Sequence, residues 1–71
     1  MKKITIIIGS VTYAAKAKRI LSGYRIPVRL IKTTADGLGC MHGIEINYVD
    51  YMDVIGILMA NGISYSVSEQ L

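Results

Sequence analysis

Cysteine, proline and the larger aromatic residues are scarce in this chain of 71 residues. It has one Cys and one Pro, and it has neither Trp nor Phe. A single Cys cannot form an internal disulfide, so the disulfide framework that stabilises many small secreted domains is excluded. The first residues, from Met1 to Thr5, do not develop into a signal peptide. We therefore expect a cytoplasmic protein.

Long hydrophobic runs are also missing, although 52% of the residues are hydrophobic. The longest apolar runs, residues 6–8 and 54–60, are far shorter than the roughly 20 residues that cross a bilayer. We expect no membrane contact, and we expect the apolar side chains to be buried in a core or in an oligomer interface. The length corresponds to one small domain, residues 1–71.

Acidic residues are fewer than basic ones, and the formal net charge is +3. Nucleic-acid-binding modules usually add stacking aromatic residues or a dense basic stripe to such a charge. This sequence has neither of these features. We therefore expect the basic residues to form a solvated helix face, and we expect no nucleic-acid partner. Most of the basic residues lie in the first third of the chain: Lys2, Lys3, Lys16, Lys18, Arg19 and Arg25.

The spacing of apolar residues predicts the order β-α-β-β-α-β. Helical spacing predicts a helix that starts after Ser10 or Thr12 and ends at Gly23, and a second helix that starts at Asp50 and ends before Gly62. Alternating apolar and polar residues predict four strands, at residues 3–9, 26–31, 43–48 and 63–68.

This order indicates an α+β fold, a ferredoxin-like sandwich with a four-stranded antiparallel sheet and two helices on one face. The first and third strands would be central. The expected core consists of Ile4, Ile6, Ile8, Val28, Leu30, Ile44, Ile46, Tyr65 and Val67 from the strands, and Ala14, Ala17, Leu21, Ile55 and Leu58 from the helices. The second helix is apolar almost all round, so some of its residues must face a partner, and we expect a homodimer.

The connection from Ala35 to His42 carries the residues that suggest chemistry. It holds the only thiol, Cys40, and the only imidazole, His42, among glycines. We expect it to be an enlarged hairpin loop with the thiol at its tip. The chain direction places this loop beside the start of the first helix. Backbone N–H groups of Ser10 and Thr12 would stabilise a thiolate there, lowering the thiol pKa from about 8.5.

The neighbours of Cys40 have expected roles as well. His42 would support the thiolate or bind a sulfur adduct. Gly39 and Gly43 would let the backbone of this chain approach a partner protein closely, which a carrier of a transferable atom needs. An inert reading is equally open, with turn glycines, a solvated His42 and an unreactive Cys40.

Three other chemistries have weaker support. Cys40 and His42 supply only two of the four ligands that structural zinc usually takes, although a symmetric dimer would double that number, and we expect no metal. A hydrolytic Cys–His pair lacks an evident third group and a substrate pocket. RNA recognition needs stacking aromatics on the open sheet face, where Thr5, Ile7, Glu45 and Asn47 are expected instead.

Three segments together resemble a small bacterial family, the selenium/sulfur carrier protein-like family. They are residues 10–21 (SVTYAAKAKRIL), 26–31 (IPVRLI) and 39–46 (GCMHGIEI). The most specific part is a Gly-Cys pair followed closely by Gly-Ile and an alternating strand. Some members place Cys directly before Gly, whereas Met41 and His42 separate Cys40 from Gly43 here.

The resemblance implies that Cys40 carries sulfur or selenium, as a persulfide or selenosulfide, from a cysteine-desulfurase-type donor to an acceptor protein. Such a carrier needs no cofactor and is not a stand-alone enzyme. The alternative function is a non-catalytic dimeric interaction module or a small-molecule-sensing module, because fold alone does not fix function. That module would use the second helix or the open face of the sheet.

Overall fold

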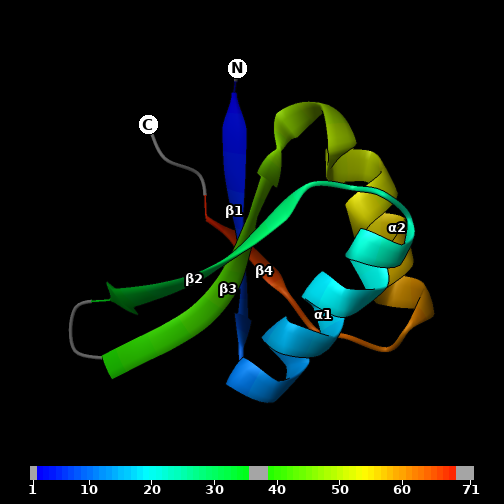
Figure 1. Cartoon of the computed structure of the whole chain (residues 1–71). Coiled ribbons are helices and arrows are strands. Elements are labelled where there is room, and N and C mark those ends of the chain that lie inside the picture. Colours follow the sequence, from blue (N-terminus) through cyan, green and yellow to red (C-terminus); the bar gives the residue numbers. More distant parts are fainter. Residues whose placement is uncertain (1, 36–38, 69–71) are drawn as a thin grey trace.

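The chain folds into an α+β structure with a four-stranded antiparallel sheet and two α-helices (Figure 1). The computed structural model describes residues 2–35 and 39–68, and for residues 33–35, 39, 40 and 68 it describes the backbone alone. The elements in chain order are β1 (Lys3–Gly9), α1 (Val11–Gly23), β2 (Val28–Ala35), β3 (Gly39–Asn47), the 3₁₀ turn η1 (Tyr48–Asp50), α2 (Tyr51–Ala60) and β4 (Ser66–Ser68).

The strand order in the sheet is β2-β3-β1-β4, so β1 and β3 are central, as the sequence predicts. Every neighbouring pair is antiparallel. The register pairs Ile6 with Ile44 and Ile4 with Ile46, which puts these isoleucines on one face of the sheet. Both helices lie on that side (Figure 1). Neither described helix is long and apolar enough to cross a membrane.

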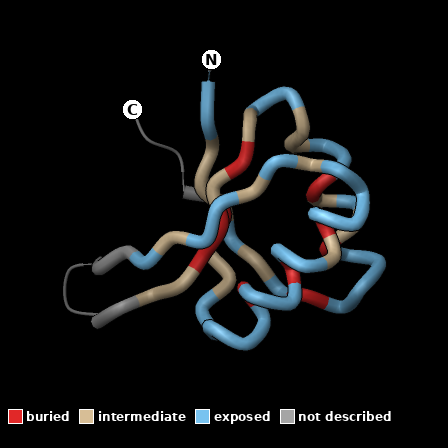
Figure 2. Tube along the Cα trace, in the orientation of Figure 1, coloured by how far each residue is buried: buried red, intermediate tan, exposed pale blue. Residues whose placement is uncertain are grey.

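The core lies between the helices and this isoleucine face, and Figure 2 shows its buried segments on both layers. Seven expected core residues are buried: Ile6, Ala14, Ala17, Leu21, Ile44, Ile46 and Leu58. Leu30 is an exception, with 40% of its surface exposed, because it lies on the edge strand β2. Val54 and Ile63 are buried in addition, whereas Ile55 is only partly buried. Residues 54 and 58, one helical turn apart, therefore form the inner face of α2.

Both helices end in the same type of cap. The N–H of Ile26 donates to the carbonyl of Leu21, and the N–H of Ile63 donates to the carbonyl of Leu58. In each cap the preceding residue has a positive φ, +62° at Arg25 and +69° at Gly62. This is the Schellman arrangement, in which a left-handed residue turns the chain back and an apolar pair closes the helix end. Residues 63–65 are not part of β4, contrary to expectation, and Ile63 belongs to the helix cap instead.

Candidate functional site

Cys40 lies in a two-stranded arm formed by the ends of β2 and β3. The pairing of β1 with β3 ends where Gly9 meets His42. The pairing of β2 with β3 continues beyond that point, through Thr34 opposite Cys40 to Ala35 opposite Gly39. In Figure 1 these strand ends project from the sheet on the side away from the helices. The Cys40 backbone is therefore flanked by β2 but not by β1.

The expected eight-residue loop from Ala35 to His42 is wrong, because both strands extend into it. Cys40 is the second residue of β3 and not the tip of a loop. Pairing with β2 gives backbone N–H and C=O groups hydrogen-bond partners that an open loop would leave to water. Gly39 likewise lies in β3, opposite Ala35. Residues 36–38, including Gly37, lie outside the described part of the chain.

His42 lies at the base of the arm. It is paired with Gly9 on one side and with Lys32 on the other, and its side chain is half-buried. Cys40 and His42 are alternate residues of β3, so they belong to the same face of the strand, about 7 Å apart along it. The structure thus brings the only thiol residue and the only imidazole residue to one face, near the point where the arm leaves the sheet.

The start of α1 adjoins His42 more closely than Cys40. The β1–β3 register shifts between Ile7 and Gly9, and Gly9 has a φ of +90° as the chain turns into the helix. Ser10 is the N-cap and accepts the N–H of Ala14 at 2.9 Å, but its side chain makes no capping hydrogen bond. Ser10 and Thr12 are both exposed. Cys40 lies two residues beyond the Gly9–His42 pair. The electrostatic field of a helix end weakens within one turn, so the start of α1 acts less on Cys40 than on His42.

Residues from three chain segments line two adjoining hollows at one end of the molecule. Met41, which follows Cys40, lines a hollow of about 170 Å³ together with Gly9 and Ser64. Tyr13 in the first turn of α1 lines a second hollow, of about 160 Å³, that Ser64 shares. The base of the arm, the start of α1 and the segment after α2 therefore meet at this end.

Gly43 has a packing role at the centre of the sheet. It is buried, and a Cβ atom added to it would collide with the carbonyl oxygen of Ile6 and lie 3.2 Å from the Cα of Ile7. No side chain fits where β3 approaches β1 this closely. Because it is buried, Gly43 does not offer the exposed backbone that a partner would approach.

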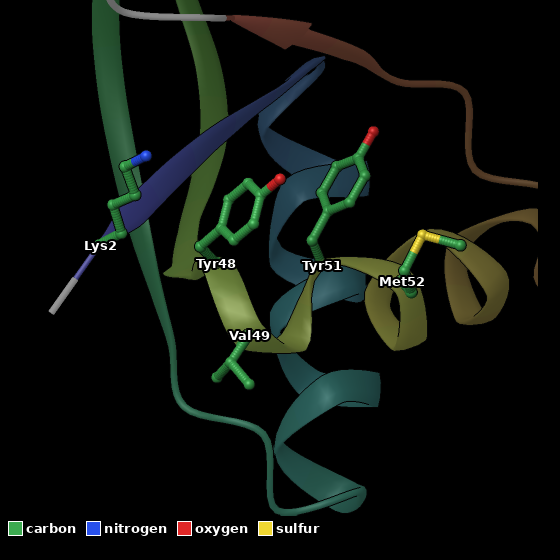
Figure 3. Close-up of a pocket in the computed structure, with 5 residues that line it drawn as sticks. All are labelled: Lys2, Tyr48, Val49, Tyr51 and Met52. Atoms are coloured by element: carbon green, nitrogen blue, oxygen red, sulfur yellow. The ribbon is translucent and has the colours of Figure 1, made fainter.

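Tyr48 and Tyr51 form a second candidate site, which sequence reasoning missed. Their rings stack at a centroid distance of 6.2 Å with an interplanar angle of 8°. The Lys2 ammonium lies 5.8 Å from the centre of the Tyr48 ring. Together with Val49 and Met52 these residues line a hollow of about 590 Å³ (Figure 3). The only signal in the sequence is the spacing of two tyrosines one helical turn apart beside a helix start.

Among the side chains that the structure describes, no three His, Cys, Asp or Glu residues gather to hold a metal ion. The side chain of Cys40 is not one of them. Arg29 and Glu45 form an ion pair at 4.0 Å on neighbouring strands, and 78% of the Arg29 side chain is exposed. No family model, no curated protein and no solved structure matches this chain.

Proposed function

We propose that this chain carries sulfur or selenium on Cys40, that its fold is ferredoxin-like, and that it works in the cytoplasm, where thiols stay reduced. The resemblance to the selenium/sulfur carrier protein-like family implies the chemistry. One structural observation carries the proposal: Cys40 lies in an arm that extends past the end of β1. A carrier must present its thiol inside the active site of another protein, and a narrow arm suits that requirement better than a flat sheet surface.

The transfer is an exchange between a thiolate and a persulfide. The Cys40 thiolate attacks the outer sulfur of a persulfide on a cysteine-desulfurase-type donor. The bond between the two donor sulfurs breaks, and the donor leaves as a thiolate. Cys40 then holds the persulfide, and a second exchange passes the outer sulfur to a nucleophile of the acceptor. With selenium the intermediate is a selenosulfide, and neither exchange needs an oxidant or a cofactor.

In this proposal, Met41 and His42 act as a spacer between Cys40 and Gly43. Gly43 is fixed against Ile6 in the sheet, and the two intervening residues place Cys40 beyond the last β1 pair. A Cys directly before Gly43 would lie opposite Gly9, inside the sheet. The longer spacing thus moves the thiol residue outward into the arm, while His42 shares its strand face and supplies an imidazole that can hydrogen-bond to a bound persulfide.

Basic residues on β2 favour an acidic donor surface. Lys32 is exposed and is paired with His42 at the base of the arm, and Arg29 is exposed three residues earlier on β2, on the opposite face of the strand. Charges of this kind mainly increase the association rate, and salt screens them. We expect the loading rate to fall as ionic strength rises, whereas the final extent of loading stays the same.

The test is to incubate the protein with a cysteine desulfurase and cysteine and to measure its intact mass. The expected result is one added sulfur atom that a reductant removes. Cys40→Ser is the matched control and should gain none. An unmodified wild-type chain, or an equal adduct on Cys40→Ser, would overturn the proposal.

The exposed residues around α2 favour a second candidate, a non-catalytic dimeric interaction module or a small-molecule-sensing module. The hollow of about 590 Å³ beside Tyr48 and Tyr51 would be its binding site. This candidate gives Cys40 no role, so it predicts that wild type and Cys40→Ser both remain unmodified in the desulfurase assay. The carrier proposal predicts a difference between them.

A further inference from the structure

The outward face of η1 and α2 is apolar and exposed. Val49, Met52 and Met59 have 80%, 78% and 66% of their surface exposed, and α2 carries one charged residue, Asp53. The exposed face of α1 shows the ordinary pattern, with charged residues at 16, 18 and 19. Helices that are apolar all round are normally buried. The outward face of α2 therefore resembles, in its residue types, a helix face that is buried against another protein surface.

The exposed apolar residues form one stripe along the helix. Val49, Met52, Gly56 and Met59 follow one another at intervals of three or four residues, which keeps them on one side. Gly56 is in the middle, and a Cβ atom added to it would meet no other atom within 4 Å. At Gly56 the backbone of α2 is therefore open to close approach from outside.

We infer that two copies of this chain pair through α2, with the two helices antiparallel and crossing at Gly56. The stripe is self-complementary about that point, as a two-fold interface requires. Met52 of one copy lies level with the small Ala60 of the other, and Asp53 lies level with Met59. No like charges face each other along the pair.

The charges at the two ends of α2 also favour this arrangement. α2 has no basic residue in its last turn, so the partial negative charge of its final carbonyl groups is not balanced within the helix. Lys2 lies beside Tyr48 at the other end, just before the helix begins. In an antiparallel pair, Lys2 of one copy approaches the helix end of the other. The hollow beside Tyr48 (Figure 3) then faces the segment after Ala60.

The area of the stripe limits how tightly two copies can bind each other. Residues 48–60 span a helix about 20 Å long and about 10 Å wide. That is a small interface compared with the roughly 800 Å² per partner of a standard complex. We therefore expect a weak, reversible dimer with a dissociation constant on the order of 100 µM.

Sedimentation velocity at protein concentrations from about 1 µM to about 500 µM tests the pairing. Wild type should shift from monomer to dimer over this range. Gly56→Lys fits the open monomer surface but places a charged side chain at the crossing, so it should weaken association at least tenfold. Ala15→Lys, on the exposed face of α1, adds the same charge and should not. A wild type that stays monomeric, or a dimer that Gly56→Lys leaves intact, overturns the inference.

A cross-link locates the contact directly. In a Cys40→Ser background, Gly56→Cys brings two thiols together at the crossing point, within the Cα separation of about 4.4–6.8 Å that a disulfide requires. Mild oxidation with diamide should give a covalent dimer, whereas Ala15→Cys in the same background should remain monomeric. Equal cross-linking of both variants contradicts the geometry. Because Cys40 is absent, the result does not depend on the carrier function.

Discussion

Gly43→Ala is the sharpest test of the packing at the base of the arm. Gly43 was expected to serve a partner protein, and the structure places it in the sheet interior instead, where a Cβ atom would collide with the carbonyl oxygen of Ile6. The colliding atom belongs to the backbone of a central strand, so no side-chain rotation relieves the contact. The two strands must separate locally or lose hydrogen bonds at this pair.

The magnitude follows from two opposing terms. Overpacking in a well-packed interior costs about 1–3 kcal/mol, and a backbone obstacle puts this case at the upper end of that range. Removing a glycine from a strand returns about 0.5–1 kcal/mol, because the unfolded chain loses freedom. We expect a net loss of about 2 kcal/mol in the free energy of unfolding. For a domain of this size, each kcal/mol lowers the melting temperature by about 4–8 °C, so Tm should fall by about 8–16 °C.

Thermal and urea unfolding followed by circular dichroism measures this loss. Gly23→Ala is the matched control, because Gly23 is in the last turn of α1 and its added Cβ would touch nothing within 4 Å. The control should gain up to about 1 kcal/mol from helix propensity. All proteins are compared at one concentration, since association would raise Tm. A Gly43→Ala protein within about 0.5 kcal/mol of wild type, the usual range of surface substitutions, would refute the close strand contact.

Two further predictions concern stability. Arg25 has a positive φ at a helix cap, a conformation that costs a non-glycine residue about 1–2 kcal/mol, so Arg25→Gly should raise the urea midpoint and Gly62→Ala at the equivalent cap should lower it. Opposite signs would contradict the shared cap geometry. Arg29→Ala removes an exposed ion pair with Glu45 and should change the free energy of unfolding by no more than about 1 kcal/mol in low or high salt; a larger, salt-sensitive loss would contradict this.

The arm shows where sequence reasoning reached its limit. Glycines at 37, 39 and 43 indicate a loop by composition, but β pairing depends on the partner strand as much as on local propensity. β2 extends to Ala35, and the residues opposite it complete their backbone hydrogen bonds by joining β3. The two glycines that the structure describes in this region, Gly39 and Gly43, are therefore strand residues. Gly43 is glycine because of its closeness to Ile6, a contact that links residues far apart in the chain.

The sequence predicts the apolar character of α2 but not which of its residues point inward or outward. The sequence shows a helix that is apolar almost all round, which predicts that part of it faces a partner. It does not show that Val54 and Leu58 point inward or that Gly56 lies in the open, because the rotation of a helix about its axis is decided by the sheet it packs on. The stacked Tyr48 and Tyr51 depend on the η1 turn, which has no clear sequence signal.

The sequence by itself determined the order of the elements, the central position of β1 and β3, and most of the core. Those features follow from apolar spacing, turn residues and chain connectivity, which are local or nearly local properties. Only the tertiary structure decided where Cys40 lies. Its place depends on β1 ending at Gly9 while β2 and β3 continue, and strand register is fixed by packing between segments distant in the chain. The thiol residue first expected at the tip of a loop is thus a strand residue of a projecting arm.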